Sequence, residues 1–432
     1  MGDILSILLK NAKIIDPLQN LKGDKLSDIL IENGKIIKID KNISSFEASR
    51  VIDLEANYLS PGFIDIHVHF RDPGFTYKED LETGSLAAIS GGFTSVVCMP
   101  NTNPPLDDEL ALFYINEKRK NLPCLIYVAT TITRSRKGEA LSDFIYLKEK
   151  YKDLIVGISD DGNDVSDTLL LYNAMKLAKE YNLVVFSHCE DKYLFEDGHL
   201  NEGKASSFYG IKGILNECES IGAYRNIILA LRTKARLHLQ HVSTKETVKL
   251  LKVFKKENIS AEATPHHFTL SEEQLLKDLD PNLKMNPPLR SKDDVKAIKK
   301  ALSENIIDVI ATDHAPHSEK EKNISFEKAP FGIIGLQTAF SLSLKLVEEG
   351  YLSLEKLIEK LSTKPSQIIG KPFIGNLKPG SLANITVFNT DETWVYTREV
   401  NKSKSFNSPF LGKTLKGKIL KTFYKGELVY ES

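Results

Sequence analysis

The amino-acid sequence predicts an α/β protein built on a (β/α)8 TIM-like barrel that lies between two β-rich ends. In the middle of the chain, eight short apolar runs of strand character alternate with longer segments of helical periodicity. Ionisable residues directly follow or end five of these runs, and a parallel barrel brings its strand ends together at one face. Near both ends of the chain, short apolar runs instead flank turn residues, as in antiparallel sheets.

The middle of the chain supplies the strands and helices of the predicted barrel. Helical patterns, with apolar residues three and four positions apart, lie between the runs, for example at residues 167–181 and 291–303. Eight strand-helix units over about 300 residues are typical of a barrel. A doubly wound parallel sheet is the structural alternative, because it is built from the same units. The eight runs lie at residues 63–69, 94–99, 125–129, 155–159, 184–187, 237–240, 259–263 and 308–311.

The two ends of the chain carry hairpin signals. Apolar residues 29–31 and 36–39 flank Asn33-Gly34, a pair favoured in two-residue hairpins because both positions take positive φ. Near the other end, residues 383–388 form a strand-like run, and residues 416–420 and 427–430 lie on either side of Lys425-Gly426. We therefore expect antiparallel strands at both ends.

Composition and charge exclude several classes of protein. The chain has 57 Lys and Arg against 58 Asp and Glu, a formal net charge of -1, which argues against a nucleic-acid partner. No apolar run is long enough to span a bilayer, and the first residues do not resemble a secretory signal. Gly2 and Ser6 fit the loose pattern for N-myristoylation, but the residues between them equally suit the start of a strand. The 4 cysteines lack CxxC spacing, so we expect a reducing, cytoplasmic location.

The residues at the strand ends predict a metal site. Residues two apart on a strand point the same way, so His67 and His69 can both face the barrel axis. Nitrogen and oxygen ligands of this kind suit Zn²⁺, and six ligands are enough for two metals that share a bridging group. His238 precedes His241 by three positions, so we expect it to face the other way and to serve in packing. The six ligands are His67, His69, His188, His241, Asp313 and a carboxylate from Asp160 or Asp161.

Three long motifs resemble those of the dihydroorotases, a family of the amidohydrolase superfamily, and more narrowly the class I bacterial form. They are residues 61–74 (PGFIDIHVHFRDPG), 99–104 (MPNTNP) and 311–317 (ATDHAPH). The resemblance covers nearly the whole chain. It implies a metal-dependent hydrolase barrel at residues 59–370. It also implies a small composite β-sandwich domain whose two halves are residues 1–58 and 371–432.

The resemblance also implies how the ligands divide between two zinc ions. His67 and His69 would hold one zinc, and His188 and His241 would hold the second. Asp161 would bridge them, with Asp313 beside the first zinc. Many relatives use a carboxylated lysine as the bridge, but no lysine follows the run at residues 155–159, and Lys148, Lys150 and Lys152 precede it. Asp160 is the weaker candidate, with a turn or a helix cap as its alternative role.

The substrate contacts follow from the same resemblance. Arg71 follows His69 by two positions and can offer a guanidinium fork to a carboxylate. The resemblance implies that Arg71, Asn101 and His317 bind the free carboxylate of dihydroorotate. It places Asn286 and the Phe331-Gly332 backbone around the pyrimidine ring, with His69 among the substrate contacts.

The implied reaction is the reversible cyclisation of N-carbamoyl-L-aspartate to L-dihydroorotate and water, in de novo pyrimidine (UMP) synthesis. A zinc-bound hydroxide would attack the ring amide carbonyl, with Asp313 as general base and then general acid. Another cyclic amidohydrolase, a dihydropyrimidinase or an allantoinase, is the nearest alternative. A non-catalytic structural partner of aspartate transcarbamoylase is the alternative from a different class. A third alternative is a chain that is both an active enzyme and a partner of aspartate transcarbamoylase. A homo-oligomer is compatible with each of these alternatives.

Overall fold

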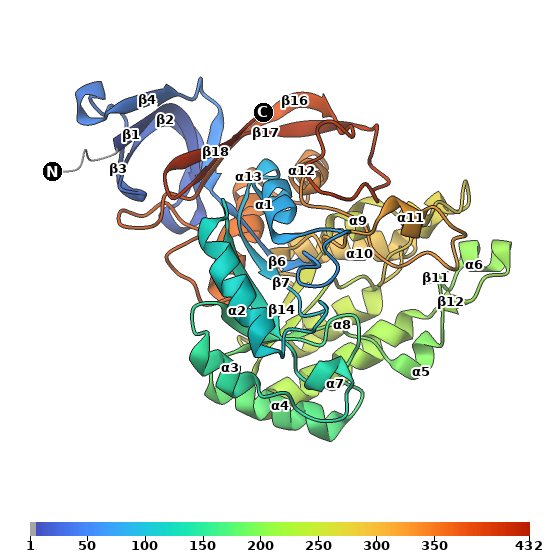
Figure 1. Cartoon of the computed structure of the whole chain (residues 1–432). Helices are drawn as coiled ribbons and strands as arrows, with labels where there is room; N and C mark the ends of the chain where they lie inside the picture. The colour runs from blue at the N-terminus through green and yellow to red at the C-terminus, as the bar shows by residue number, and fades with distance from the viewer. Residues whose placement is uncertain (1–5) are drawn as a thin grey trace.

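The computed structural model describes residues 6–432 and shows a parallel barrel joined to a mixed β-sheet (Figure 1). The barrel strands neighbour one another in chain order, apart from the two short strands β11 (Leu200–Asn201) and β12 (Gly213–Ile214) outside it. All eight predicted runs are strands of this barrel. They are β6 (Phe63–Val68), β7 (Phe93–Cys98), β8 (Leu125–Thr130), β9 (Ile155–Ile158), β10 (Val184–Ser187), β13 (Arg236–Leu239), β14 (Ile259–Ala263) and β15 (Val309–Ile310).

The first and last strands meet, which distinguishes the barrel from an open sheet. A parallel bridge joins Val68 to His314, and the His69 N–H donates to the His314 carbonyl at 2.9 Å. Below this contact, the Thr312 N–H donates to the Asp65 carboxylate at 3.1 Å. The doubly wound alternative is therefore wrong, because its two edge strands would not pair. Gly2, where the myristoylation pattern falls, lies outside the described residues.

Helices cover the outside of the barrel, and apolar side chains fill its inside. Ile64 and Ile66 of β6 pack inside with Phe186 of β10, whereas Phe63 and Val68 pack outside with the helices. The helices predicted at residues 167–181 and 291–303 are α4 and α10. The longer helices are α1 (Leu81–Ser90), α2 (Glu109–Lys118), α3 (Phe144–Lys150), α4 (Thr168–Glu180), α7 (Asn216–Thr233), α8 (Lys245–Phe254), α10 (Lys292–Ser303) and α12 (Ala339–Glu348). The shorter ones are α5 (Lys192–Phe195), α6 (Lys204–Tyr209), α9 (Pro265–Thr269), α11 (Glu319–Lys322), α13 (Leu354–Ile358) and α14 (Lys364–Ile368).

The two ends of the chain form one mixed sheet, in which the blue and red strands of Figure 1 lie side by side. The strand β5 (Tyr58–Pro61) joins the two ends, because it pairs with β1 (Ser6–Asp16) on one edge and with β16 (Ile385–Val395) on the other. Both predicted hairpins are present, since β2 pairs with β3 across Asn33-Gly34 and β17 with β18 across Lys425-Gly426. The strands are β1 (Ser6–Asp16), β2 (Leu21–Glu32), β3 (Lys35–Asp40), β4 (Arg50–Asp53), β5 (Tyr58–Pro61), β16 (Ile385–Val395), β17 (Thr414–Tyr424) and β18 (Glu427–Glu431).

The loop between β16 and β17 reaches back to the barrel at the carboxyl ends of its strands. Ser403 and the Lys404 N–H bind the buried carboxylate of Glu79, which precedes α1. Asn407 binds the backbone of Ala315 and Gly332. The C-terminal segment is thus part of the wall around the barrel mouth. Within residues 6–432, no helix combines the length and the apolar character needed to cross a bilayer.

Candidate metal centre and active site

The polar residues at the strand ends surround one cavity of about 140 Å³ at the barrel mouth. Most of the residues predicted for the site line this cavity, although they come from distant parts of the chain. His67 lies beneath it and is fully buried. The lining residues are His69, Arg71, Asn101, Asp161, Gly162, His188, His241, Asn286, Asp313, Ala315, Phe331 and Gly332.

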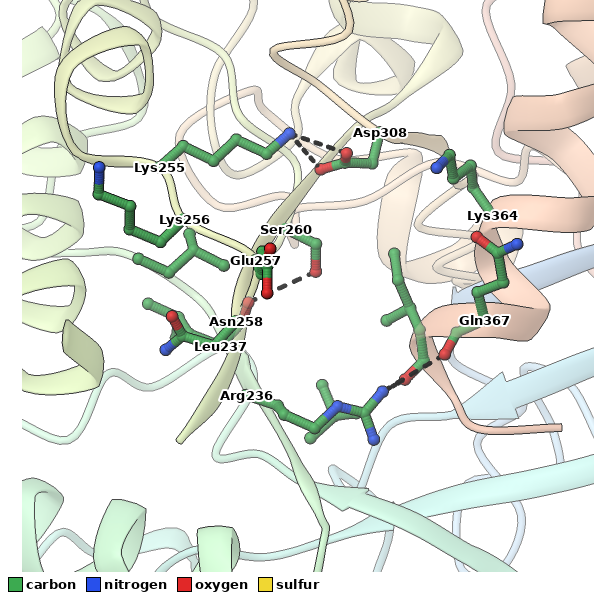
Figure 2. A pocket seen from close by; sticks show the side chains of 13 residues that line it. Arg236, Leu237, Lys255, Lys256, Glu257, Asn258, Ser260, Asp308, Lys364 and Gln367 are labelled. Carbon is green, nitrogen blue, oxygen red and sulfur yellow. Dashed lines mark hydrogen bonds and ion pairs between the residues drawn. The ribbon is translucent and has the colours of Figure 1, made fainter. Parts of the chain in front are cut away.

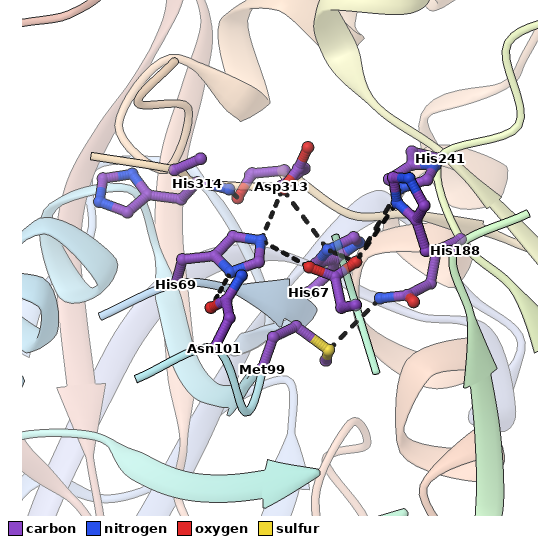
Figure 3. Close-up of polar contacts among 12 residues, drawn as sticks. His67, His69, Met99, Asn101, His188, His241, Asp313 and His314 are labelled. Atoms are coloured by element: carbon purple, nitrogen blue, oxygen red, sulfur yellow. Dashed lines mark hydrogen bonds and ion pairs between the residues drawn. The ribbon is translucent and has the colours of Figure 1, made fainter. Parts of the chain in front are cut away.

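Asp161 lies between two pairs of histidines. Its carboxylate is 3.3 Å from Nε2 of His67 and 3.4 Å from Nε2 of His69. On the other side, Oδ1 is 3.7 Å from Nδ1 of His188 and 4.0 Å from Nε2 of His241. Figure 3 shows His69 on one side of His67 and His188 with His241 on the other. The two triads that could each hold a metal ion therefore share Asp161.

The nitrogen and oxygen atoms at the centre of these triads are better placed to bind a metal ion than to hydrogen-bond with one another. Nε2 of His67 and Oδ1 of Asp161 are buried and have no hydrogen-bonding partner. Nδ1 of His188 and Nε2 of His241 lie only 2.9 Å apart. Buried polar atoms usually have a partner, so atoms that converge without one indicate a site that could hold a metal ion. Imidazole nitrogens with carboxylate oxygens form a set that suits Zn²⁺.

The pKa values of the site residues are shifted by the close approach of carboxylates and histidines. Burial by itself lowers the pKa of His67, but the surrounding carboxylates, led by Asp313, raise that pKa well above its ordinary value. Burial also opposes the charge on His188, but the nearby carboxylates of Asp161 and Glu190 raise its pKa to about 10. Burial raises the pKa of Asp161, and the neighbouring His67 and His69 lower it well below its ordinary value. The metal-free site is therefore a network of ion pairs.

A β-bulge directs His67 into the site. In the pairing of β6 with β7, Asp65 lies opposite Val96 and Val68 opposite Cys98, so β6 carries one extra residue between these pairs. The extra residue allows His67 to point inward directly after Ile66, while Val68 packs outside the barrel. The His67 N–H donates to the Asp65 carboxylate at 3.0 Å, which fixes the bulge.

Three residues of the site take left-handed backbone conformations where their strands end. The φ angles are 60° at Arg71, 34° at His241 and 49° at Asp313. Residues other than glycine rarely adopt such angles, and strained residues of this kind concentrate at functional sites. Each turn redirects a side chain that regular strand geometry would place elsewhere.

Asp313 and Asp160 have different surroundings. Oδ1 of Asp313 lies 2.9 Å from Nε2 of His69 and 3.4 Å from Nε2 of His67, at the mouth of the cavity. Asp160 points away and accepts hydrogen bonds from the backbone of Ile132 and Thr133, so it holds a loop, in keeping with the turn role. Lys148 donates to the carbonyl of Ile155, the first residue of β9, and thus lies at the opposite end of the barrel from Asp161.

The predicted substrate residues lie around one side of the cavity. Oδ1 of Asn101 accepts from Nδ1 of His69 at 2.8 Å, which leaves the Asn101 amide group free to donate. Burial lowers the pKa of Arg71 to about 10, so its guanidinium stays charged at neutral pH. His317 lies behind Arg71, 3.5 Å from its guanidinium, and binds the Phe331 carbonyl at 2.8 Å. His317 is not among the residues that line the cavity.

Comparisons with known proteins agree with this architecture. The amidohydrolase family model matches residues 58–429. A dihydroorotase of Aquifex aeolicus (strain VF5) is 45% identical over 431 residues, which cover 99% of this chain and 100% of the relative. Dihydroorotases of Carboxydothermus hydrogenoformans and Clostridioides difficile are 44% and 43% identical, and each match covers 99% of this chain and at least 98% of the relative.

The chain belongs to the dihydroorotase family. Among solved structures, an L-hydantoinase (dihydropyrimidinase) from Arthrobacter aurescens superposes with a TM-score of 0.86 at 24% identity, covering 98% of this chain and 96% of that one. A dihydropyrimidinase from Brevibacillus agri gives a TM-score of 0.83 at 21% identity, covering 99% and 95%. At such identities these structures share the fold with this dihydroorotase family member, and the fold by itself does not decide the substrate.

Sequence reasoning missed several residues that support the site in this dihydroorotase family member. Glu262 of β14 is fully buried and binds Nδ1 of His67 at 2.6 Å. Burial by itself raises the pKa of Glu262, but His67 and His238 lower it to about 2. Contrary to the expectation from its spacing, His238 does not face away from the site. It lies inside the barrel, packs against Phe186 and binds Glu262 at 2.9 Å. The left-handed turn at His241 breaks the alternation on which that expectation depended.

Further supports come from residues near the mouth. Glu190 binds Nε2 of His188 at 3.3 Å and the Asn286 amide at 2.7 Å, so it orients both. Asn407 of the C-terminal segment accepts from the His317 N–H at 3.1 Å. The Arg136 guanidinium donates to the Asp161 carbonyl. Glu190 follows His188 by two positions, so its place in the sequence could have indicated it, whereas nothing in the sequence marks Asn407 or Arg136.

Proposed function

We propose that this chain catalyses the reversible cyclisation of N-carbamoyl-L-aspartate to L-dihydroorotate and water, as its family relatives are named to do. The observation that carries the proposal is the position of Arg71, a half-buried and charged guanidinium, beside the carboxylate-bridged histidines. A cyclic amide with a free carboxylate fits this pair of features, because the guanidinium can bind the carboxylate while the ring amide faces the metal ligands.

We propose that about two zinc ions occupy the site, held by His67 and His69 on one side and His188 and His241 on the other. Asp161 would take the bridging position, since no lysine lies at the end of β9 to do so. When bound, the ions make water acidic enough to supply a nucleophile near neutral pH and polarise a carbonyl oxygen. The converging, unpartnered donor atoms support this assignment.

Asp313 is the residue proposed to move the proton. Its carboxylate lines the cavity and lies within 3.4 Å of the ligating nitrogens of His67 and His69. A carboxylate there can take a proton from the attacking water and give it to the departing ring nitrogen. In the direction of ring closure, the same carboxylate takes the proton from the ureido nitrogen.

The substrate would be oriented by residues on the Arg71 side of the cavity. Arg71 and the free amide of Asn101 can bind the carboxylate, while the Phe331 and Gly332 backbone and Asn286 border the ring. His317 would support the substrate side indirectly, because it lies 3.5 Å from the Arg71 guanidinium and binds the Phe331 carbonyl. His69 would contribute both to the first metal and to the substrate face of the cavity.

One experiment tests substrate and metal together. Purified protein is stripped with a chelator, reloaded with zinc, and assayed with dihydroorotate, dihydrouracil and allantoin in parallel. The proposal expects hydrolysis of dihydroorotate, dependent on zinc, with little turnover of the other two substrates. A preference for dihydrouracil or allantoin would favour a dihydropyrimidinase or an allantoinase. A zinc content near zero after reloading would favour a non-catalytic partner protein.

We also propose a cellular location and two forms of association for this chain. The cysteines of the described chain are free and buried, which supports a reducing, cytoplasmic location. Association into a homo-oligomer, or with aspartate transcarbamoylase, stays a prediction from the family resemblance. Light scattering on the purified protein, alone and mixed with aspartate transcarbamoylase, tests both forms of association.

A further inference from the structure

Glu262 contacts one metal ligand from each of the two triads. Its Oε1 accepts from Nδ1 of His67 at 2.6 Å and from the backbone N–H of His241 at 3.2 Å. His67 belongs to the triad with His69, and His241 to the triad with His188. The Glu262 side chain is wholly inaccessible to solvent. A single buried carboxylate therefore links both halves of the proposed metal centre without itself being one of the ligands.

The direction of these hydrogen bonds sets the form of His67. An ionised carboxylate only accepts hydrogen bonds, so Nδ1 of His67 must carry the proton that Glu262 accepts. The lone pair of a neutral His67 is then on Nε2, the atom that points toward Asp161 at 3.3 Å. In histidine ligands, the bond made by the second ring nitrogen fixes both the tautomer and the orientation of the ring.

The remaining oxygen of Glu262 continues this network away from the site. Oε2 accepts from Nε2 of His238 at 2.9 Å. When the His238 ring is neutral, this bond leaves Nδ1 as an acceptor for the hydroxyl of Ser260, which lies 2.8 Å away. The His238 ring packs edge to face against Phe186, with centroids 5.6 Å apart, which holds it in this orientation. Each donor in the chain from Ser260 to His67 thus meets an acceptor.

The chain of hydrogen bonds runs through the barrel. Ser260 lies at the start of β14 and lines a second cavity, of about 590 Å³, with Arg236, Lys255 and Asp308 (Figure 2). These residues lie where the parallel strands begin, whereas the metal ligands lie where they end. Ser260, His238 and Glu262 together connect the floor of the barrel to its mouth.

We propose that Glu262, His238 and Ser260 are positioning residues that preset His67 and His241 for metal binding. This role rests on the proposed metal centre, and it belongs to residues that orient the ligands without binding the metal themselves. Glu262 fixes the ligands directly, His238 fixes Glu262, and Ser260 fixes the tautomer of His238. The effect of removing each residue should therefore decrease in that order.

The test measures zinc affinity rather than turnover. Chelator-stripped wild type, Glu262→Gln, His238→Phe and Ser260→Ala are titrated with zinc in competition with a chromogenic chelator. We expect zinc binding to weaken about 10- to 100-fold in Glu262→Gln, as for other partners of ligating histidines. We expect a smaller loss in His238→Phe, whose ring keeps the contact with Phe186, and the smallest loss in Ser260→Ala.

A matched control separates positioning from general stability. Glu79 is also a fully buried glutamate bound to a histidine, His314 at 3.3 Å, which is not a proposed ligand. Glu79→Gln should bind zinc as the wild type does, even if its metal-free form unfolds at lower urea concentrations. The absorption bands of the cobalt-loaded proteins should shift in Glu262→Gln and not in Glu79→Gln.

A double-mutant cycle tests whether His238 acts through Glu262. A glutamine at position 262 has one amide nitrogen, which would face a donating ring nitrogen of either His67 or His238, so two donors would meet. The substitution His238→Phe removes one of these donors and thus the conflict. Glu262→Gln should therefore cost less zinc affinity in the His238→Phe background than alone. Additive losses would overturn the coupling, and equal zinc affinities in wild type, Glu262→Gln and His238→Phe would overturn the proposal.

Two further outcomes are a Glu262→Gln variant that does not fold and a wild-type protein that binds no zinc. If Glu262→Gln does not fold, His238→Phe and Ser260→Ala still report on the relay, and wild-type affinity in both would overturn it. If the wild type itself binds no zinc, the proposed metal centre fails, and the proposal fails with it. That result differs from the case in which wild type and variants bind zinc equally, where only the positioning role is lost.

Discussion

The Asp313 carboxylate lies 2.9 Å from Nε2 of His69, the nitrogen that His69 also directs toward Asp161. Asp313 is therefore held beside the proposed first metal position and still lines the cavity where a substrate would bind. In the proposed reaction, this arrangement would let one carboxylate transfer a proton between water and the ring nitrogen.

Asp313→Asn should retain zinc and lose turnover. The amide keeps the size of the carboxylate but cannot take up a proton, and general acid-base catalysis contributes about 10²- to 10⁴-fold to rates. We expect kcat to fall by a factor in that range, while zinc content measured by atomic emission stays near that of the wild type. Near-normal turnover in Asp313→Asn would contradict its assignment as the proton-transfer residue.

Arg71→Met should weaken the binding of the carboxylate-bearing substrate. Hydrogen bonds to charged groups contribute about 1.5–3 kcal/mol, so KM for dihydroorotate should rise about 10- to 100-fold. The activity toward dihydrouracil, which has no carboxylate, should change much less. Arg134 is exposed and pairs with Asp143 at 3.4 Å on the surface, so Arg134→Met is the control and should keep the wild-type KM. Equal effects on both substrates would argue against a carboxylate contact.

Asn407→Ala should raise KM more than it lowers kcat. The Asn407 amide donates to the carbonyls of Ala315 and Gly332, both at 3.0 Å, so it holds the wall next to the substrate. Each buried group that loses its partner costs about 1–3 kcal/mol, so urea should also unfold the variant more easily. Asn401 makes similar bonds within its own loop, to Ser403 and Ser405. Asn401→Ala should lower stability while KM stays unchanged, and a parallel rise of KM would show that the effect is not local.

Zinc binding should release protons. In the metal-free protein, carboxylates raise the pKa of His67 well above its ordinary value, and the nearby carboxylates of Asp161 and Glu190 raise that of His188 to about 10, in both cases against the effect of burial. Both rings thus carry an extra proton at pH 7.5, and each must lose it to ligate zinc. We expect release of about two protons per chain and an affinity that falls as the pH is lowered. Calorimetry in buffers with different ionisation enthalpies measures the release, and a value near zero at pH 7.5 would contradict these pKa directions.

Much of the fold could be predicted from local patterns. The eight barrel strands and both hairpins lie within a few residues of their predicted positions, because strand periodicity and the turn residues Asn33-Gly34 and Lys425-Gly426 act over short stretches of chain. The proposed ligands could be identified for a related reason. Parallel strands in a barrel end at one face, so residues at strand ends meet there whatever the details of packing.

The sequence by itself determined the barrel, the antiparallel hairpins near the two ends of the chain and most of the residues that gather at the barrel mouth. Only the tertiary structure decided how these side chains are oriented and which residues hold them in place. The bulge turns His67 inward, and the backbone makes a left-handed turn at His241. Glu262 and Asn407 hold site residues through hydrogen bonds. Glu262 meets His67 across 195 residues of chain. Such contacts depend on how separate elements pack, and no local pattern in the sequence encodes the packing of elements so far apart.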